Sequence, residues 1–464
     1  MYAQISSKKI LEPAALVVGL SFVLYAVISL SGKTVIPVLL ALSAGILVTA
    51  FLLKKPAYFI LGYFLLLPLT LENPEGISPG ESVFLFYTIL VAIFYLFLPI
   101  ITGRLKLETT LDKLFLLFTL MLPYASALGL LNGANIYPAI GELTYYAGVF
   151  IYFALRHYLD KESFQRGLLY VFTLVLLFVI ARNAYNYQEI ILQAYVPWQV
   201  EKARVASNEV LILFFTTLCT AAFVYAKTFK LNFVALFFLG CGFLSLILTQ
   251  SRGYWLAFIL SFSIIFLFVS AEKKGKMLIY FTAILVSILV IAKIYFSDFF
   301  DLIFNALIAR FESIATSTQV DVSLLERIEE SASVFSKISV NPVLGYGLGT
   351  EYVKFIFFER FHLSTSYVHN GYLGAWYKFG LPGLLLLLGI CVSIIRNSYR
   401  IFKQRDETVH KIIALTILAT IAGMLLVNNT SPQFLAFDSI LLLTMMAAYC
   451  SQFQPAINTK ENNS

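Results

Sequence analysis

The chain has 464 residues, of which 59% are hydrophobic and only 13% are charged, and its formal net charge is +7 at pH 7. Soluble globular domains average about 45–50% apolar and about 25% charged residues, so this composition excludes a water-soluble enzyme. The positive charge needs no nucleic-acid partner, because the cytoplasmic loops of membrane proteins collect Lys and Arg. The composition therefore predicts a polytopic membrane protein that binds no nucleic acid.

Continuous apolar runs along the chain predict membrane-spanning helices, each of which needs about 20 predominantly apolar residues. The runs are continuous rather than alternating, which argues against a transmembrane β-barrel. The third run is short, so a tilted, broken or re-entrant segment is an alternative there. The predicted fold is an all-α polytopic transmembrane helix bundle of 12–14 spans, near residues 13–30, 35–53, 57–70, 82–101, 112–131, 137–155, 166–182, 208–226, 231–249, 253–270, 277–296, 375–395, 409–427 and 434–451.

The distribution of basic residues predicts the orientation of these spans. If the N-terminus is cytoplasmic, every inner segment between spans holds at least two Lys or Arg. The short outer loops near 71–81, 132–136 and 428–433 hold none. By the positive-inside rule, we expect both termini to be cytoplasmic.

This organisation divides the chain into four parts. We expect an N-terminal transmembrane part of about 11 spans over 1–296, an outer loop with amphipathic helices over 297–374, C-terminal transmembrane helices over 375–451 and a cytoplasmic tail over 452–464. A second long outer segment is predicted over 183–207.

The long outer loop contains apolar residues at helical spacing. They predict a helix that lies on the outer membrane surface or covers the bundle, and Asn341-Pro342 ends it. The residues concerned are Leu324, Leu325, Ile328, Ala332, Phe335 and Ile338.

Charged residues in or next to the predicted spans gather toward their outer ends. Charges inside a bilayer are expensive and mark function by default, and a transporter would place such groups near the midplane. Their concentration on one side favours an outward-facing chamber over a path through the membrane. These residues are Glu142, Arg182, Glu209, Arg252, Lys378 and Asp438.

Three arginines are candidates for binding a diphosphate, because a guanidinium matches phosphate in a bidentate geometry and stays protonated. Arg252 lies in a tight outer turn between two spans, Arg204 in the segment 183–207 and Arg327 in the predicted loop helix. The alternative for Arg252 is contact with lipid headgroups. The alternative for Arg204 is an exposed loop charge, and that for Arg327 is an ion pair with neighbouring glutamates.

His369 is the candidate general base, because a neutral imidazole can remove a hydroxyl proton near physiological pH. It stands at the outer entrance to the span near 375–395. The alternative is a histidine that caps a helix or packs among aromatic rings, and His362 is a weaker candidate base. The chain has no His and Cys cluster with metal-ligand spacing, no P-loop and no dinucleotide fingerprint. We therefore expect a reaction that uses no metal and no cofactor.

Three motifs, in order along the chain, resemble those of the O-antigen ligase and polymerase superfamily. They are S-R-G within TQSRGYWL (249–256), N-P-x-x-G-x-G within NPVLGYGLGT (341–350) and H-N-x-x-L with a following G-x-x-G-L within HNGYLGAWYKFGLPGL (369–384). The resemblance covers about 220–400. One departure is Lys378, where members of this group often carry an acidic residue.

The resemblance implies a C-type glycosyltransferase-like enzyme of the bacterial inner membrane with a periplasmic active site. Its donor would be a glycan on undecaprenyl diphosphate, and the transfer would invert the anomeric centre without a metal. Carried over to matching positions, Arg252 and Arg204 bind the diphosphate and His369 is the base. Arg327 is carried over to diphosphate binding as well, although no motif sets its register.

The leading interpretation is an O-antigen ligase of lipopolysaccharide biosynthesis, whose acceptor is a hydroxyl of lipid A–core. The alternative is an O-antigen or exopolysaccharide polymerase, whose acceptor is a second lipid-linked repeat. A Ser/Thr-directed protein glycosyltransferase is a third variant. A transporter of lipid-linked sugars is less favoured, and a non-catalytic membrane scaffold is the least favoured. Expected partners are the lipid-linked glycan, its acceptor and membrane lipids.

Overall fold

The computed structural model describes most of the chain beyond residue 55. The predicted spans near 13–30 and 35–53, and Arg204 of the predicted diphosphate site, lie outside the described residues. The residues described are 56–65, 79–192, 208–295, 300, 304, 305, 308, 312, 322–356 and 361–454.

All regular elements in the first half of the described chain are helices, as the apolar runs predict. A π-helical turn continues the span predicted near 82–101, and a 3-10 turn interrupts the one predicted near 137–155. The elements are α3 (Pro56–Leu65), α4 (Pro79–Ala92), η2 (Ile93–Phe97), α5 (Leu98–Ile101), α6 (Thr110–Leu131), α7 (Ile136–Tyr145), η3 (Ala147–Ile151), α8 (Tyr152–Tyr158) and α9 (Glu162–Leu192).

The second half adds further long helices and one antiparallel pair of strands, which the sequence did not predict. The elements are α11 (Glu209–Tyr225), α12 (Phe229–Leu248), α13 (Arg252–Phe268), α14 (Ala271–Tyr295), α16 (Val322–Val340), β1 (Tyr352–Ile356), β2 (Phe361–Thr365), α17 (Gly371–Gln404), α18 (Thr408–Val427), η4 (Gln433–Leu435) and α19 (Phe437–Ser451).

The described chain is that of a multi-pass, all-α membrane protein. Among the residues that the structure describes, six helices are long and apolar enough to cross a membrane, namely α6, α9, α12, α14, α17 and α18. Shorter apolar helices accompany them, among them α11, α13 and α19. One boundary differs from the prediction: α9 continues to Leu192, so the outer segment expected from residue 183 begins as helix.

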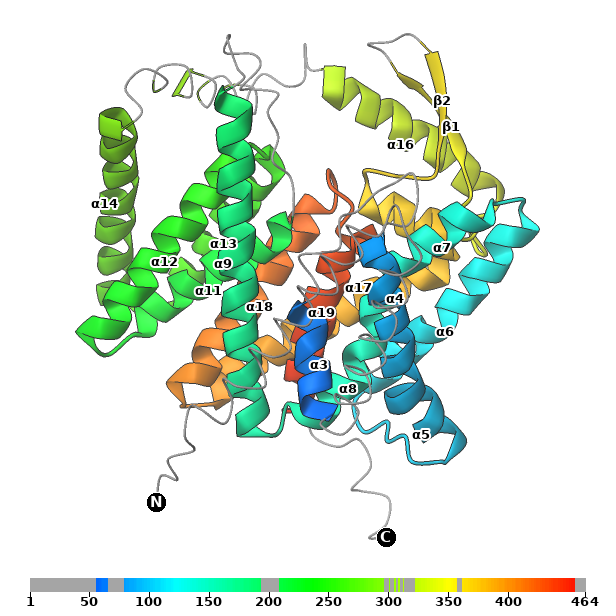
Figure 1. Ribbon diagram of the computed structural model, residues 1–464, viewed down its shortest axis with the longest axis horizontal. Coiled ribbons are helices and arrows are strands. Elements are labelled where there is room, and N and C mark those ends of the chain that lie inside the picture. The colour runs from blue at the N-terminus through cyan, green and yellow to red at the C-terminus, as the bar shows by residue number, and fades with distance from the viewer. Residues whose placement is uncertain are drawn as a thin grey trace, which may run out of the picture.

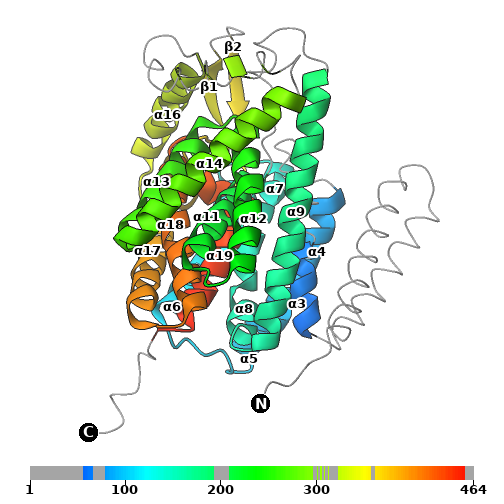
Figure 2. The same cartoon turned by 90° about the vertical axis from the view of Figure 1, so that its left-hand side faces the viewer.

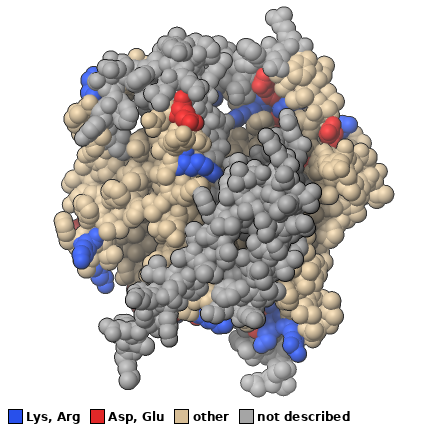
Figure 3. Space-filling model, viewed as in Figure 1, with Lys and Arg blue, Asp and Glu red and all other residues tan. Residues whose placement is uncertain are grey.

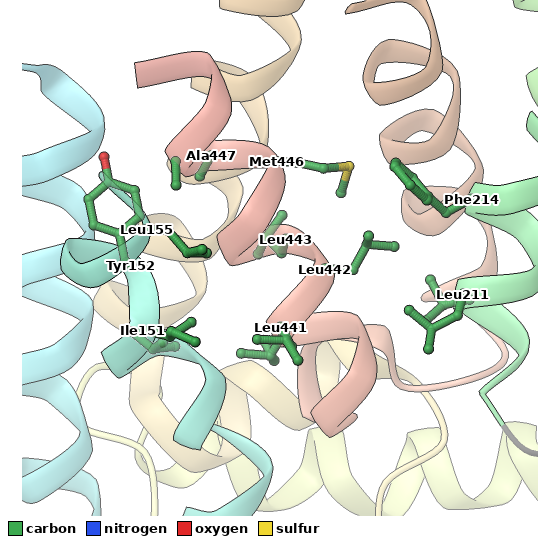
Figure 4. Close-up of a cluster of buried hydrophobic side chains, with 14 of the residues drawn as sticks. Ile151, Tyr152, Leu155, Leu211, Phe214, Leu441, Leu442, Leu443, Met446 and Ala447 are labelled. Atoms are coloured by element: carbon green, nitrogen blue, oxygen red, sulfur yellow. The ribbon is translucent and has the colours of Figure 1, made fainter. Parts of the chain in front are cut away.

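Helix α19 lies at the centre of the bundle and joins its two sides. Figure 4 shows Leu441 and Ala447 facing η3 and α8, while Leu442 and Met446 face α11. All four side chains are buried. Burial of this apolar surface between helices from distant parts of the chain holds the bundle together by close packing.

Helix α16 and the two strands lie together at one end of the bundle, which we call the α16 end (Figures 1 and 2). The strands pair from Tyr352 with Thr365 to Ile356 with Phe361. On the face drawn in Figure 3, charged side chains of the described residues gather toward the two ends of the bundle, and a largely uncharged band lies between them. Such a band suits a lipid environment.

Candidate active site

His369 is held by a buried carboxylate at the α16 end. Its ring Nδ1 lies 2.8 Å from Oε2 of Glu330, and its backbone amide donates to Oε1 of the same residue. The Glu330 side chain is only 2% exposed, whereas that of His369 is 34% exposed. An ionised carboxylate only accepts hydrogen bonds, so Nδ1 carries the proton and Nε2 is the ring nitrogen left for a substrate.

Lys354 completes this group from strand β1. Its Nζ donates to Oε2 of Glu330 over 2.8 Å. Burial alone would raise the pKa of the Glu330 carboxyl, but the hydrogen bonds and charges of His369 and Lys354 outweigh it, and the pKa lies below its usual range. Glu330 is therefore ionised at neutral pH, as its role as an acceptor requires.

The face of α16 that packs against the protein differs from the predicted apolar stripe. Val334 and Ile338 are buried against Tyr352, Val368 and Tyr377. Glu330 precedes Val334 by four residues and so lies on the same buried face.

The helix itself is confirmed, but three residues of its predicted apolar face do not lie in the protein interior. Leu325, Ile328 and Phe335 are 47%, 57% and 52% exposed. A carboxylate takes a place on the buried face because Lys354 and His369 satisfy it there.

A break in α17 anchors residues 341–351, which follow α16 and which we call the return segment. Gly380 has φ 68° and ψ −177°, a conformation that glycine adopts without strain, and Pro382 has no amide proton to continue the helix. The carbonyls of Tyr377 and Lys378 therefore lose their helical partners. They accept instead from the amides of Tyr346 and Gly347, over 2.8 and 3.1 Å.

The same return segment passes close to α6. The amide of Leu348 donates to the carbonyl of Ala125 over 2.9 Å. A Cβ on Gly347 would lie 2.0 Å from the amide nitrogen of Gly129, so only glycine fits there. The glycines of the N-P-x-x-G-x-G and G-x-x-G-L motifs thus place β1, and with it Lys354, at the site.

Glu142 and Lys378 form a second buried pair, 236 residues apart in sequence. Lys378 Nζ lies 2.9 Å from Oε1 of Glu142 and 2.9 Å from the carbonyl oxygen of Thr350. Oε2 of Glu142 accepts from the amide of Gly349 over 2.7 Å. The pair therefore ties α7 and α17 to the return segment, and the lysine that departs from the family pattern has a partner.

The turn between α18 and α19 brings the start of α17 and the start of α13 together. The amide of Gly371 donates to the carbonyl of Asn428 over 2.8 Å. The hydroxyl of Tyr254 donates to Oε1 of Gln433 over 3.1 Å. His369 lies two residues before Gly371 and Arg252 two residues before Tyr254. Both predicted site residues therefore flank the turn over 428–433.

The structure tests the two alternatives for His369, namely a helix cap and packing among aromatic rings. Asn370, not His369, caps α17, because its side chain accepts from the amides of Tyr372 and Leu373. His369 does contact an aromatic ring, that of Tyr367, edge to face at 5.0 Å between ring centroids. His362 is exposed on β2, paired with Phe355 across the strands.

Two of the predicted diphosphate-binding arginines lie on different helices of the described chain. Arg252 is the first residue of α13 and is half-buried. Arg327 is half-buried on α16, three residues before Glu330 and hence on the same side of the helix. Glu330, one of the glutamates near Arg327 in sequence, pairs with Lys354 and His369.

A second polar cluster lies beside the same turn. Arg182 donates to Oδ1 of Asn208 over 2.9 Å, and Asn208 donates to Oδ2 of Asp438 over 3.3 Å. Ser439 donates to Oε1 of Gln433 over 2.8 Å, the atom that also accepts from Tyr254. Arg182 and Asp438 were expected at the outer ends of different spans, and hydrogen bonds through Asn208 connect them.

A cavity lies next to the residues that precede His369. Its walls come from α7, the residues just before His369, α17 and η4. The lining residues are Tyr137, Pro138, Gly141, Glu142, Tyr145, Tyr146, Ser366, Tyr367, Lys378 and Leu435.

The arrangement suits removal of a proton from a hydroxyl group beside a bound anion. An imidazole oriented by a buried carboxylate can act as a general base, and guanidinium groups such as those of Arg252 and Arg327 can hold phosphate oxygens. Within the described ranges, no group of three or more His, Cys, Asp and Glu side chains is placed to hold a metal ion.

Sequence reasoning missed two contributors to this site, Glu330 and Lys354. Glu330 is one of three glutamates close together in the loop helix, and nothing local distinguishes it from Glu326 and Glu329. Its spacing of four residues to Val334 and eight residues to Ile338 is the signal that could have identified it.

Comparison with known proteins agrees with the motifs. Residues 235–388 match the family model described as O-antigen ligase. The matched segment contains Arg252, Arg327, Glu330, Lys354 and His369. The match supports membership of the O-antigen ligase superfamily and confirms the predicted resemblance over this segment. No curated protein matches the chain.

Proposed function

Because residues 235–388 match the O-antigen ligase family, we propose that this protein transfers a glycan from a polyprenyl diphosphate to an acceptor hydroxyl at the α16 end. The family match supports an O-antigen ligase- or polymerase-type function. The single observation that carries the proposal is the contact of Glu330 with Nδ1 of His369, which leaves Nε2 for the acceptor.

In the proposed reaction, the acceptor hydroxyl oxygen attacks the anomeric carbon of the donor. Its proton passes to Nε2 of His369, and Glu330 stabilises the imidazolium that forms. The bond between the anomeric carbon and the diphosphate oxygen breaks, and the electron pair leaves with the diphosphate. Attack from the face opposite the leaving group inverts the anomeric centre.

Arg252 and Arg327 would neutralise the charge that develops on the leaving diphosphate, and Arg204 is assigned to the same role from the family resemblance. No step of the scheme requires a metal or a cofactor. The α16 end would face the periplasm of an inner-membrane protein, as the distribution of Lys and Arg predicts.

We assign lipid A–core as the acceptor, which makes the protein a ligase. The test is a transfer assay with the purified full chain, undecaprenyl-diphosphate glycan, and lipid A–core present or absent. Product that forms only with lipid A–core supports the ligase. A ladder of products in the absence of lipid A–core would show that the protein is a polymerase and not a ligase. No product in either reaction, from folded protein, overturns glycan transfer altogether.

Arg252→Ala tests the diphosphate site in the same assay. Loss of one charge-stabilising group should lower kcat about 100- to 1,000-fold. The matched control is Arg396→Ala, an exposed arginine far along α17, which should leave the rate unchanged. Equal rates for the two variants would remove Arg252 from the proposed site.

A further inference from the structure

Three short connections between helices meet at the end of the bundle away from α16 (Figures 1 and 2). They join α11 to α12, α13 to α14 and α17 to α18. Buried apolar side chains pack beneath them as one cluster, among them Phe223 of α11, Val269 between α13 and α14, and Leu415 of α18. Polar side chains on these connections are therefore brought close together.

Four lysines stand at these connections, and we call them the lysine cluster: Lys227, Lys273, Lys276 and Lys411. Lys227 lies between α11 and α12, Lys273 and Lys276 lie in the first two turns of α14, and Lys411 lies in the first turn of α18. The other three are near enough to Lys273 for their charges to repel its own. Like charges gathered in one place destabilise the fold, and an anion bound among them would remove that cost.

Two carboxylates neutralise only part of this charge. Glu272 attracts Lys273, and Asp406 lies 3.5 Å from Nζ of Lys411 but is fully exposed. An ion pair with an exposed carboxylate contributes little. The carboxylate that follows Asp406 in sequence pairs with His410 instead, over 3.1 Å. Among the described groups, four lysines therefore face two carboxylates, and positive charge is in excess.

Two of the lysines are held in place by the protein. Nζ of Lys276 donates to Oδ1 of Asn232 over 2.8 Å and to the carbonyl oxygen of Phe223 over 3.4 Å. Nζ of Lys273 lies 3.9 Å from the centroid of the Tyr225 ring, and a ring face attracts a cation without neutralising its charge. An ammonium group has three protons, so Lys276 keeps one for a further acceptor.

Exposed apolar side chains continue from the lysine cluster along α14 and α12. Leu278 and Ile279 follow Lys276 on α14, Phe229 and Phe233 lie in the first two turns of α12, and all four are more than half exposed. Both helices are long and apolar enough to cross a membrane. Cations beside such a surface match both parts of a phospholipid, its phosphate and its acyl chains. Free phosphate would use only the first.

We propose that the lysine cluster binds the phosphate headgroup of an anionic phospholipid, whose acyl chains lie against α12 and α14. Basic pockets between membrane helices bind such headgroups on the cytoplasmic side, and the distribution of Lys and Arg predicts that this end is cytoplasmic. The bound phosphate would fasten α14 to the connections at α11 and α18. The inference does not rest on the proposed function, because His369 lies at the other end of the bundle.

The first test is the melting temperature of the purified, delipidated full chain in a neutral detergent. Four additions are compared at equal phosphate concentration: cardiolipin, phosphatidylglycerol, zwitterionic phosphatidylcholine and inorganic phosphate. We expect the anionic lipids to raise the melting temperature by about 3–5 °C and the other two to leave it unchanged. A rise with only one anionic lipid identifies the headgroup. No rise with either, or an equal rise with phosphatidylcholine or inorganic phosphate, overturns the proposal.

The double variant Lys273→Gln with Lys411→Gln locates the site. It removes two charges and leaves the hydrogen bonds of Lys276 in place. Each basic residue near an anionic membrane surface contributes about 1 kcal/mol, so cardiolipin should bind about 30-fold more weakly and its effect on the melting temperature should largely disappear. The readout is the change on adding lipid, which does not depend on the variant's own melting temperature.

The matched control is Lys106→Gln with Lys113→Gln, which removes two exposed lysines at the start of α6, on the same predicted side of the membrane. It should keep the full rise with cardiolipin. Equal rises in the two double variants would show that the lysine cluster is not the site. Equal losses would show that only net charge matters, and either result refutes the proposal.

A second measurement separates bound lipid from an effect on the micelle. In native mass spectrometry, the parent should retain cardiolipin and the Lys273→Gln, Lys411→Gln variant should lose it; equal retention by both would refute the site. His369→Ala should show the full rise with cardiolipin and transfer no glycan. A failed transfer assay therefore leaves this inference standing. An active chain that shows no rise refutes this inference and leaves the proposed function standing.

Discussion

Glu330 and Glu142 are two carboxylates at the same end of the molecule, and each holds a lysine across a distance of 2.8 or 2.9 Å. They differ in what else they bind. Glu330 also holds the imidazole of His369, whose side chain is 34% exposed. Glu142 also holds the amide of Gly349 in the return segment, and its lysine is 2% exposed.

The difference indicates which of the two pairs can take part in chemistry. A reacting group must reach substrate, and only the Glu330 pair has a partner with a ring nitrogen left free for one. The Glu142 pair fastens backbone segments from α7, α17 and the return segment. Similar ionic chemistry therefore holds an imidazole in one place and fixes the fold in the other.

The largest effect on activity is expected from His369→Ala. Removal of a general base lowers the rate about 100- to 10,000-fold, and the half-exposed side chain can be removed without loss of the fold. The measurement is kcat in the reconstituted assay together with the melting temperature. His362→Ala, on β2 at the same end, is the control and should retain full activity. Full activity in His369→Ala would end its assignment as the base.

Lys378→Met should act on the fold instead. Removal of one partner from a buried ion pair costs about 3–5 kcal/mol of stability, because Glu142 is left with an uncompensated charge. A lower melting temperature in detergent checks this. The double variant Lys378→Met with Glu142→Leu should recover part of the loss. If the Lys378→Met variant keeps the melting temperature of the parent but transfers less glycan, the Glu142–Lys378 pair acts in the reaction as the Glu330 pair does. That result would contradict the assigned difference between the two pairs.

Glu330→Gln should have a smaller effect on activity than His369→Ala, because the imidazole remains but loses its orienting carboxylate. Carboxylates that orient metal-bound histidines contribute about 10- to 100-fold, and we expect a loss of that order here. The loss should fall on kcat rather than on KM for the donor, and Glu330→Asp should recover part of it. If kcat is unchanged while only the melting temperature falls, Glu330 is a structural residue like Glu142.

The smallest effect concerns the pH dependence of stability. The pKa of Glu330 is lower in the folded protein than its usual value. Its ionised form therefore stabilises the fold above the unfolded pKa of about 4.3, and this contribution is lost as the pH falls through the folded pKa. The melting temperature of the parent should exceed that of Glu330→Gln at pH 6. The gap should close as the pH falls below about 4.

Several features of this protein follow from its sequence alone. The apolar runs predict most of the described helices, because a hydrophobic segment of membrane-spanning length is a local property. Arg252 and His369 were predicted for one end of the bundle from charge placement and from motifs. The turn over 428–433 does bring the start of α13 and the start of α17 together.

Other features depend on packing between segments that are distant in sequence. Glu330 became the partner of His369 because α16 turns that face, rather than the face of Ile328 and Phe335, toward the protein. The strand pair, the docking of the return segment at the break in α17 and the Glu142–Lys378 pair also join distant residues. Hydropathy and spacing describe single segments. A buried charge must be paired because it has lost its contact with water. The tertiary structure alone determines which charged residues pair with each other.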